Sequence, residues 1–331
     1  MAKVVQIGLG PLGQGVVRCA LKRSGIRIVA AVDPAPGKVG RDLGRLCSLK
    51  PIGITVRKDL KSALKGKKAD VAVLTTVSTL RRIEEQIEEV ARAGLNIVST
   101  CEELAFPWRT HPRIAERIDA FCRKYGIACV GTGVNPGFLM DYLPCVLSSI
   151  CQKVVGVKIT RIQDASKRRI PFQQKIGVGL TRAQFKAKVA EGTLRHVGLV
   201  ESMHMIAHSM NWKLDRTAET VKPVIAERTV TSGYVRVGKG SARGVEQIGR
   251  GYIGKKEVLR LHFRAAVGEK ESFDAVEIIG DPTLRSIMPG GINGDDATCA
   301  ITVNALRTIC AVGPGLKTML DLPVPGYSER I

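Results

Sequence analysis

The order of apolar and polar positions gives the first part of the chain a regular alternation. Up to about residue 135, short apolar runs alternate with longer segments whose apolar positions recur at helical spacing. The expected strands are Lys3–Gly8, Arg27–Asp33, Val71–Thr75, Asn96–Thr100 and Ala128–Thr132, and the expected helices are Gly13–Ser24, Arg41–Leu46, Leu80–Ala93 and Ile114–Tyr125. Strands that alternate with helices in this way predict a parallel sheet covered by helices.

The pattern changes after Gly133–Gly137. The later strand candidates lie farther apart and favour a mixed or antiparallel sheet. We expect helices over Leu139–Ile150, Gly198–Met210 and Ala297–Cys310, strands over Val154–Ile162, Val258–Ala266 and Ala275–Ile279, and a loop over Pro314–Pro325. The predicted domains are therefore residues 1–138, completed by a C-terminal helix at about 296–331, and residues 139–295.

The charge of the chain is strongly positive. Fifty-one Lys and Arg residues stand against 30 Asp and Glu, a net charge of +21. The basic residues are spread along the chain and aromatic residues make up only 4%. This pattern favours attraction of small phosphate-bearing ligands over nucleic-acid binding. The other interpretation, a nucleic-acid-binding protein that senses a cofactor, is testable by gel shift at physiological salt.

Cysteine usage and the N-terminus indicate the compartment. The nine cysteines are scattered and form no C-x-x-C pair, which predicts reduced, mostly buried thiols and no zinc site. The first residues lack the layout of a signal peptide, and no apolar run reaches the ~18–20 residues of a membrane span. We therefore expect a cytoplasmic protein without a membrane partner.

A glycine motif lies where the first strand ends. Gly8-Leu9-Gly10-Pro11-Leu12-Gly13 follows an apolar strand, opens a helix and leads to a second strand that ends in Asp33. This context predicts an α/β protein with an N-terminal Rossmann domain, in which the glycines admit a pyrophosphate at the helix N-terminus. The cofactor-binding candidates here are Gly8, Gly10, Pro11, Leu12, Gly13 and Asp33.

The residues around Asp33 bear on the choice of cofactor. An acid at this position accepts hydrogen bonds from the adenosine ribose and repels a 2′-phosphate, which favours NAD. However, Lys38 and Arg41 follow closely and are candidates to hold that phosphate. The sequence predicts NAD or NADP, with a slight preference for NAD.

Polar residues also follow other strands. Ligands of open α/β sheets bind beyond the carboxyl ends of the strands, so Thr75, Thr76 and Ser78 are candidates to flank the cofactor. The alternative, that they cap the helix expected from Leu80, stays open. We place Cys101 and Asn135 with the cofactor-binding candidates for the same reason.

Two carboxylates, Glu102 and Glu103, follow the buried strand Asn96–Thr100. A carboxylate beside the nicotinamide is placed for proton transfer, which makes both residues catalytic candidates. An acid that complements a helix dipole is the competing interpretation.

Several blocks in order resemble the 2,4-diaminopentanoate dehydrogenases and the related native amine dehydrogenases, whose architecture is similar to that of dihydrodipicolinate reductase. The blocks are Gly8–Gly13, Ser99–Trp108, Gly131–Phe138, Glu201–Ala207, Trp212–Asp215, Pro314–Leu316 and Asp321–Pro325. The resemblance implies NAD(P)-dependent oxidation of a primary amine to an imine, which is hydrolysed to a ketone or aldehyde and ammonia, or the reverse reductive amination. It also implies a second α+β domain for substrate binding and dimerisation.

The family's catalytic glutamate falls on the pair Glu102–Glu103, and we prefer Glu102. The resemblance implies no metal, a small amine or carbonyl and ammonia as partners, and a homodimer. The remaining alternative is a reductase of a cyclic imine similar to dihydrodipicolinate reductase. The substrate-binding candidates are Asn135, Pro136, Phe138, Arg161, His196 and Thr298. For Arg161, a pair with a substrate carboxylate and a structural ion pair are both open.

Overall fold

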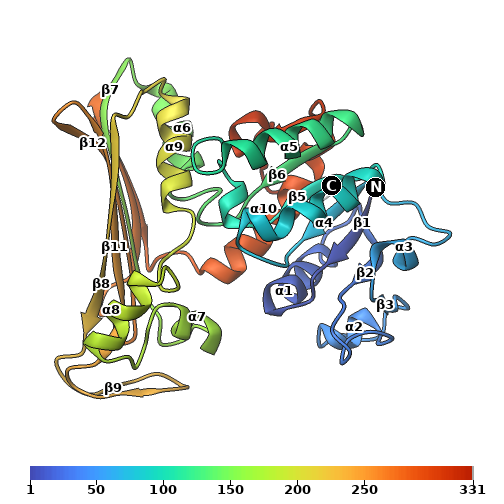
Figure 1. The fold of residues 1–331 in the computed structure, drawn as a ribbon, viewed down its shortest axis with the longest axis horizontal. Helices are drawn as coiled ribbons and strands as arrows, with labels where there is room; N and C mark the ends of the chain where they lie inside the picture. The colour runs from blue at the N-terminus through green and yellow to red at the C-terminus, as the bar shows by residue number, and fades with distance from the viewer. Residues whose placement is uncertain (330–331) are drawn as a thin grey trace. The chain divides into compact units, whose positions relative to one another are not determined.

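The structure is a computed structural model that describes residues 1–329 (Figure 1). The chain divides into two compact units, one formed by residues 1–138 with 293–331 and the other by residues 139–292. The second boundary lies three residues before the predicted one. Within the described residues, no helix is both long and apolar enough to cross a membrane.

A seven-stranded parallel sheet forms the centre of the first unit, in the order β15-β6-β5-β4-β1-β2-β3. Its strands are β1 (Ala2–Ile7), β2 (Ile26–Val32), β3 (Val56–Arg57), β4 (Val71–Leu74), β5 (Asn96–Ser99), β6 (Ala128–Gly131) and β15 (Gly315–Lys317). From β3 to β6 this is the order of a Rossmann sheet, with the direction of winding reversed between β1 and β4. The predicted N-terminal Rossmann domain is therefore confirmed.

Helices cover this sheet. They are α1 (Pro11–Ala20), α2 (Leu43–Leu46), α3 (Leu60–Ala63), α4 (Leu80–Arg92), α5 (Pro112–Lys124) and α10 (Gly294–Ile309). The apolar positions of α4, including Leu80, Ile83 and Ile87, are buried in one core with strand residues such as Ala72 and Ile97. This core excludes water from the sheet and so fixes the strand ends on which the site is built.

Two predicted boundaries near the C-terminus were wrong. The last long helix begins at Gly294, not near Ala297, because the side chain of Asn293 caps it by accepting the N–H groups of Asp295 and Asp296. The tail predicted as a loop contains β15, which pairs with β6, and a 3₁₀ helix η3 (Met319–Asp321). With only three residues, β15 is too short to show an alternation of apolar and polar positions in the sequence.

The second unit is built on a six-stranded mixed sheet in the order β14-β13-β7-β12-β11-β8, in which only β7 and β12 run parallel. Its strands are β7 (Lys153–Asp164), β8 (Arg216–Ile225), β11 (Ala242–Ile253), β12 (Lys256–Ala266), β13 (Phe273–Asp281) and β14 (Leu284–Pro289), with a short hairpin of β9 (Val230–Thr231) and β10 (Arg236–Val237). The mixed sheet agrees with the prediction.

The helices of the second unit lie along one face of this sheet (Figure 1). They are α6 (Tyr142–Leu147) with the 3₁₀ helix η2 (Ser148–Ile150), α7 (Ile170–Lys175), α8 (Arg182–Ala190) and α9 (Leu199–Ser209). The helix predicted from Leu139 begins only at Tyr142, because Asp141 adopts a non-helical conformation and its side chain accepts the Tyr142 N–H. Alternate side chains of β7, including Val157, Ile159 and Arg161, point to the buried face.

Candidate functional site

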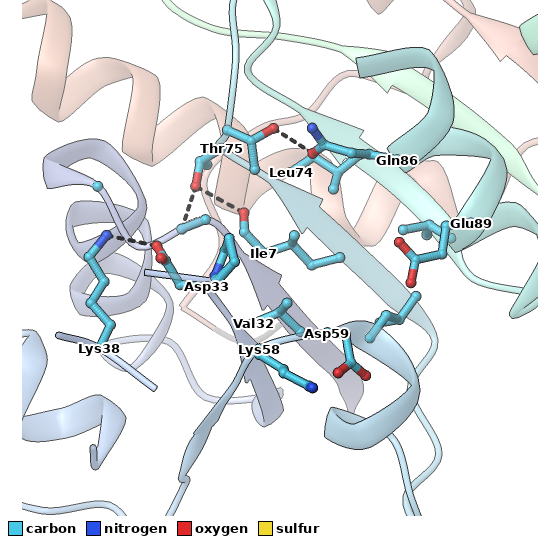
Figure 2. Close-up of a pocket in the computed structure, with 16 residues that line it drawn as sticks. Ile7, Val32, Asp33, Lys38, Lys58, Asp59, Leu74, Thr75, Gln86 and Glu89 are labelled. Carbon is cyan, nitrogen blue, oxygen red and sulfur yellow. Dashed lines mark hydrogen bonds and ion pairs between the residues drawn. The ribbon is translucent and has the colours of Figure 1, made fainter. Parts of the chain in front are cut away.

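A cavity of about 540 Å³ opens in the first unit at the reversal of winding between β1 and β4. Its lining includes Gly8, Gly10, Asp33, Thr75 and Thr76, which come from the ends of three strands (Figure 2). The sequence predicted all five as cofactor-binding residues, and the fold brings them to one place. A crevice beyond the carboxyl ends of parallel strands at such a reversal is where α/β sheets bind nucleotides.

The glycine loop leaves room for a ligand at one position only. A Cβ atom on Gly8, whose φ is +88°, would lie 2.6 Å from the carbonyl oxygen of Thr75, and one on Gly13 would lie 2.6 Å from Thr75 Oγ1. A Cβ on Gly10 would have no neighbour within 4 Å. Gly8 and Gly13 therefore pack the loop, whereas Gly10 keeps the cavity open beside the N-terminus of α1. The loop fits the pyrophosphate of a dinucleotide.

Thr75 holds the glycine loop through its hydroxyl. Thr75 Oγ1 donates to the carbonyl of Gly8 at 2.8 Å, and Gln6 Nε2 donates to Thr75 Oγ1 at 2.8 Å and to the same carbonyl at 2.9 Å. Gln6 is a buried polar residue inside an apolar strand, a signal that sequence reasoning did not use. Both side chains give the loop one conformation before any ligand arrives.

Two glycine variants should separate packing from ligand space. Gly13→Ala places a methyl group against Thr75 and the loop backbone, so we expect a loss of about 1–3 kcal/mol of unfolding free energy together with weaker cofactor binding. Gly10→Ala should keep the stability of the wild type and weaken the cofactor alone, because its methyl group occupies the ligand's space. Thermal unfolding without cofactor and titration with NADH measure the two effects. Equal destabilisation by both variants would contradict this division of roles.

Asp33 lies at the end of β2 and is 6% exposed. Its Oδ2 accepts the N–H of Leu9 at 2.8 Å and the ammonium of Lys38 at 2.7 Å, and its Oδ1 accepts the N–H of Ala35 at 3.0 Å. Burial acts to raise the pKa of Asp33, but the hydrogen bonds from Lys38, Ala35 and Leu9 outweigh it, and the pKa lies below its usual value. The carboxylate is therefore ionised at neutral pH.

Of the remaining cofactor-binding candidates in this unit, Thr76 lines the cavity, whereas Arg41, Pro11 and Leu12 do not. Thr76 donates to Gln86 Oε1 at 2.7 Å, and Gln86 and Lys58 also line the cavity, although the sequence analysis did not select them. Arg41 is exposed and donates to the carbonyl of Gly37 at 3.4 Å. Pro11 occupies the first turn of α1, and the carbonyl of Leu12 accepts from Cys299 Sγ at 3.8 Å.

The two glutamates lie in the 3₁₀ helix η1 (Glu102–Leu104), just after β5. Glu103 is 6% exposed, and its Oε2 accepts the backbone N–H of Leu80 at 2.8 Å at the start of α4. Its backbone N–H donates to the carbonyl of Ser78 at 3.3 Å, and His111 Nε2 lies 3.9 Å from the same carboxylate. Glu103 thus caps α4, the task that the sequence analysis left open for Thr75, Thr76 and Ser78.

Glu102 is half-buried at the carboxyl edge of the sheet. The adjacent Cys101 is 1% exposed, and burial raises the pKa of its thiol far above the usual value. A neutral, enclosed thiol is a poor nucleophile, so Cys101 supports the packing behind the carboxylates.

The segment after β6 is buried from Thr132 to Gly137 and belongs to the same unit as α10. Thr298, near the start of α10, accepts the N–H of Val134 at 3.1 Å through Oγ1. Asn135 and Pro136 are buried and Phe138 is half-buried. Thr298 therefore fixes the loop that carries three of the predicted substrate-binding residues.

Arg161 lies in the second unit, in the middle of the sheet. Its Nη1 lies 3.0 Å from Asp274 Oδ1, and its Nη2 donates to the carbonyl of Ile292 at 2.9 Å. Asp274 Oδ2 in turn accepts the N–H of Ile292 at 2.7 Å. Burial lowers the pKa of Arg161 to about 10 and raises the pKa of Asp274. Of the two interpretations from sequence, these contacts describe a structural ion pair.

His196 lies in the loop between α8 and α9 and packs against β12 of the same sheet. Its ring packs edge-on against Phe263, the neighbour of Arg161 on β12, with 4.4 Å between ring centroids. Its Nδ1 lies 2.8 Å from the carbonyl of Val197; a carbonyl only accepts, so Nδ1 carries the hydrogen. Burial, and then the charges of Lys175 and Arg161, lower the pKa of His196 to about 3. The imidazole is neutral at physiological pH.

Comparison with known proteins identifies the family to which this architecture belongs. Residues 138–329 match the 2,4-diaminopentanoate dehydrogenase C-terminal domain, and residues 2–101 match the dihydrodipicolinate reductase N-terminus. A 2,4-diaminopentanoate dehydrogenase of Acetoanaerobium sticklandii is 32% identical over 98% of this chain and 94% of its own length. The chain belongs to the 2,4-diaminopentanoate dehydrogenase family.

Further relatives of this dehydrogenase family agree. An amine dehydrogenase of Streptomyces virginiae is 23% identical over 98% of this chain and 97% of its own length. The amine dehydrogenase structure from Mycobacterium smegmatis shares the fold, with a TM-score of 0.88 at 24% identity over 100% of this chain and 98% of its own. The predicted class, an oxidoreductase that acts on CH–NH2 groups, is confirmed.

Proposed function

We propose that this family member oxidises the CH–NH2 group of a small primary amine, and aminates the matching ketone or aldehyde in reverse, with Glu102 as the proton-transferring residue. The observation that carries this assignment is the bond from the Leu80 N–H to Glu103. That bond places the Glu103 carboxylate at the start of α4, and it supports Glu102, which is half-buried at the carboxyl edge of the sheet, as the proton-transferring residue.

The proposed work of Glu102 follows from its charge. The carboxylate accepts a proton from the substrate ammonium, which frees the nitrogen lone pair to form the C=N bond as hydride leaves the carbon. Once the carboxyl group has released this proton to solvent, its negative charge stabilises the iminium ion. It next accepts a proton from the water that adds to the iminium carbon and passes this proton to the nitrogen. Ammonia then leaves as the hydroxyl group loses its proton and the carbonyl forms. A bound nicotinamide supplies the hydride acceptor.

NAD or NADP is the proposed cofactor, held by the glycine loop and Asp33 in the cavity of Figure 2. The shape of the loop supports this assignment, since only Gly10 leaves space beside the N-terminus of α1. Asn135, Pro136, Phe138, His196 and Thr298 stay proposed substrate-binding residues. The name of the Acetoanaerobium relative supports a substrate that carries a second amine and a carboxylate.

The cyclic-imine reductase is a weaker candidate. The relatives with that activity, such as a 4-hydroxy-tetrahydrodipicolinate reductase of Methanococcus maripaludis, match only 30% of this chain. The family match to dihydrodipicolinate reductase covers only residues 2–101, whereas residues 138–329 match the C-terminal domain of the diaminopentanoate enzymes.

An ammonium-dependence assay tests the proposed reaction. Oxidation of NADH and NADPH is followed with a panel of small ketones, aldehydes and 2-amino-4-oxopentanoate, with and without ammonium. We expect cofactor oxidation only when ammonium is present, and cofactor reduction with the matching amine. Turnover of a carbonyl or a cyclic imine that does not depend on ammonium would overturn the proposal.

We further propose a homodimer formed through the second unit. Its sheet carries helices on one face, whereas the other face bears a mixture of charged and apolar side chains such as Ile162, Arg264 and Ile287. Light scattering coupled to gel filtration should give twice the mass of the 35.7 kDa chain. Arg264→Glu together with Ile287→Asp should shift it towards a monomer, and an unshifted mass would place the interface elsewhere.

A further inference from the structure

The acid at the end of β2 is neutralised by a residue of its own loop. In Figure 2 the Lys38 side chain points to Asp33. Lys38 Nζ lies 2.7 Å from Asp33 Oδ2. The other hydrogen bonds of this carboxylate come from the backbone N–H groups of Leu9 and Ala35. Both oxygens of Asp33 are thus occupied, and the net charge of the Asp33–Lys38 pair is zero.

A zero net charge changes what the pocket selects. A lone carboxylate at this place accepts ribose hydroxyls and repels the 2′-phosphate of NADP. In this chain a lysine sits on the carboxylate, and a second one, Lys58, lines the same cavity. The repulsion of a phosphate is therefore offset before a ligand arrives.

Asp33 and Lys38 differ in how firmly they are held. Asp33 is buried and fixed by two backbone N–H groups, whereas the Lys38 side chain is 28% exposed. Among residues 1–329, Asp33 is the acceptor of the one hydrogen bond that the Lys38 ammonium donates. The Lys38 ammonium is a compact charge on a flexible side chain, so it can turn towards another anion at a small cost in free energy. Asp33 then keeps its hydrogen bonds from the backbone N–H groups.

We propose that Lys38 is the specificity-determining residue that lets this pocket accept both NADH and NADPH. With NADH, the ammonium stays on Asp33 and orients the carboxylate towards the ribose hydroxyls. With NADPH, the ammonium turns to the 2′-phosphate, with Lys58 as the second cation. The inference rests on the proposed use of a pyridine nucleotide, and it is independent of which amine the enzyme oxidises.

The test is a pair of dissociation constants, for NADH and NADPH, measured by cofactor fluorescence without amine or carbonyl. Lys38→Met keeps the aliphatic stem and removes the charge. Since a hydrogen bond to a charged group contributes about 1.5–3 kcal/mol, we expect the Kd for NADPH to rise about 10- to 100-fold and the Kd for NADH to change less than about threefold. Lys38→Arg should retain NADPH binding.

Arg45→Ala is the matched control, because Arg45 is an exposed cation of α2, shortly after Lys38 in sequence, and it does not line the cavity. It should shift both constants slightly and equally. Equal weakening of NADH and NADPH by Lys38→Met, or an unchanged Kd for NADPH, overturns the role of Lys38 and leaves the proposed reaction standing. If the wild type binds neither nucleotide, the proposed function fails together with this inference.

Discussion

Glu102→Gln should lower kcat for the ammonium-dependent reaction by about 10²- to 10⁴-fold, the range typical of a lost general acid–base group. The amide has nearly the shape of the carboxylate, so the fold and the Kd for NADH should stay at their wild-type values. The loss should fall on kcat, because the proton transfers and the iminium charge arise during turnover. Steady-state rates and cofactor fluorescence measure the two parts.

Glu103 provides the control within the same 3₁₀ helix. Glu103→Ala removes the acceptor of the buried Leu80 N–H, so we expect a loss of about 1–2 kcal/mol of unfolding free energy. Below its melting temperature this variant should retain most of the wild-type kcat. If Glu103→Ala abolishes turnover in a folded, cofactor-binding protein while Glu102→Gln remains active, the assignment of the two glutamates is reversed.

Arg161→Ala should be the most destabilising of the substitutions considered, at about 3–5 kcal/mol of unfolding free energy. It leaves the Asp274 carboxylate, which is 3% exposed, without its cation, and it removes one of the two side-chain donors to the Ile292 carbonyl, the other being Gln163. Urea unfolding followed by circular dichroism gives the value. A change in substrate KM with unaltered stability would instead support the substrate-binding interpretation of Arg161.

A double variant tests whether the unpaired Asp274 carboxylate causes the loss of stability in Arg161→Ala. Arg161→Met with Asp274→Asn removes both charges and keeps an oxygen that can accept the Ile292 N–H. Replacing a buried ion pair by neutral groups of similar volume is often close to neutral, so the double variant should recover most of the lost stability. A double variant as unstable as Arg161→Ala would show that packing, and not charge, sets the effect.

The sequence predicts those helices and strands whose apolar positions follow a regular pattern. Long amphipathic helices such as Leu80–Arg92 and apolar strands such as Val71–Leu74 were located within a few residues. The strand Arg216–Ile225 was missed because its charged residues Arg216, Glu219 and Lys222 interrupt any apolar alternation. The strand Ala242–Ile253 was missed because it contains Gly244, Gly249 and Gly251. Both form only because neighbouring strands supply their hydrogen bonds.

The site shows the same limit. The glycine motif and Asp33 were found because their spacing is fixed by a local strand–turn–helix. The difference between Glu102 and Glu103 depends on Leu80, which lies 23 residues from Glu103 in sequence. The partner of Arg161, Asp274, is 113 residues away. Such contacts come from the packing of elements and have no local pattern that reveals them.

Because β15 pairs with β6, the sheet of the first unit is completed only late in translation. The nucleotide-binding unit begins at the first residue, yet its sheet receives its last strand at Gly315–Lys317, and Ser24 donates to the carbonyl of Glu329. The intervening unit, residues 139–292, is contiguous and leaves the ribosome first in full. During translation, the first unit therefore stays incomplete, with the edge of its sheet at β6 uncovered, until its own C-terminal segment follows the second unit out of the ribosome.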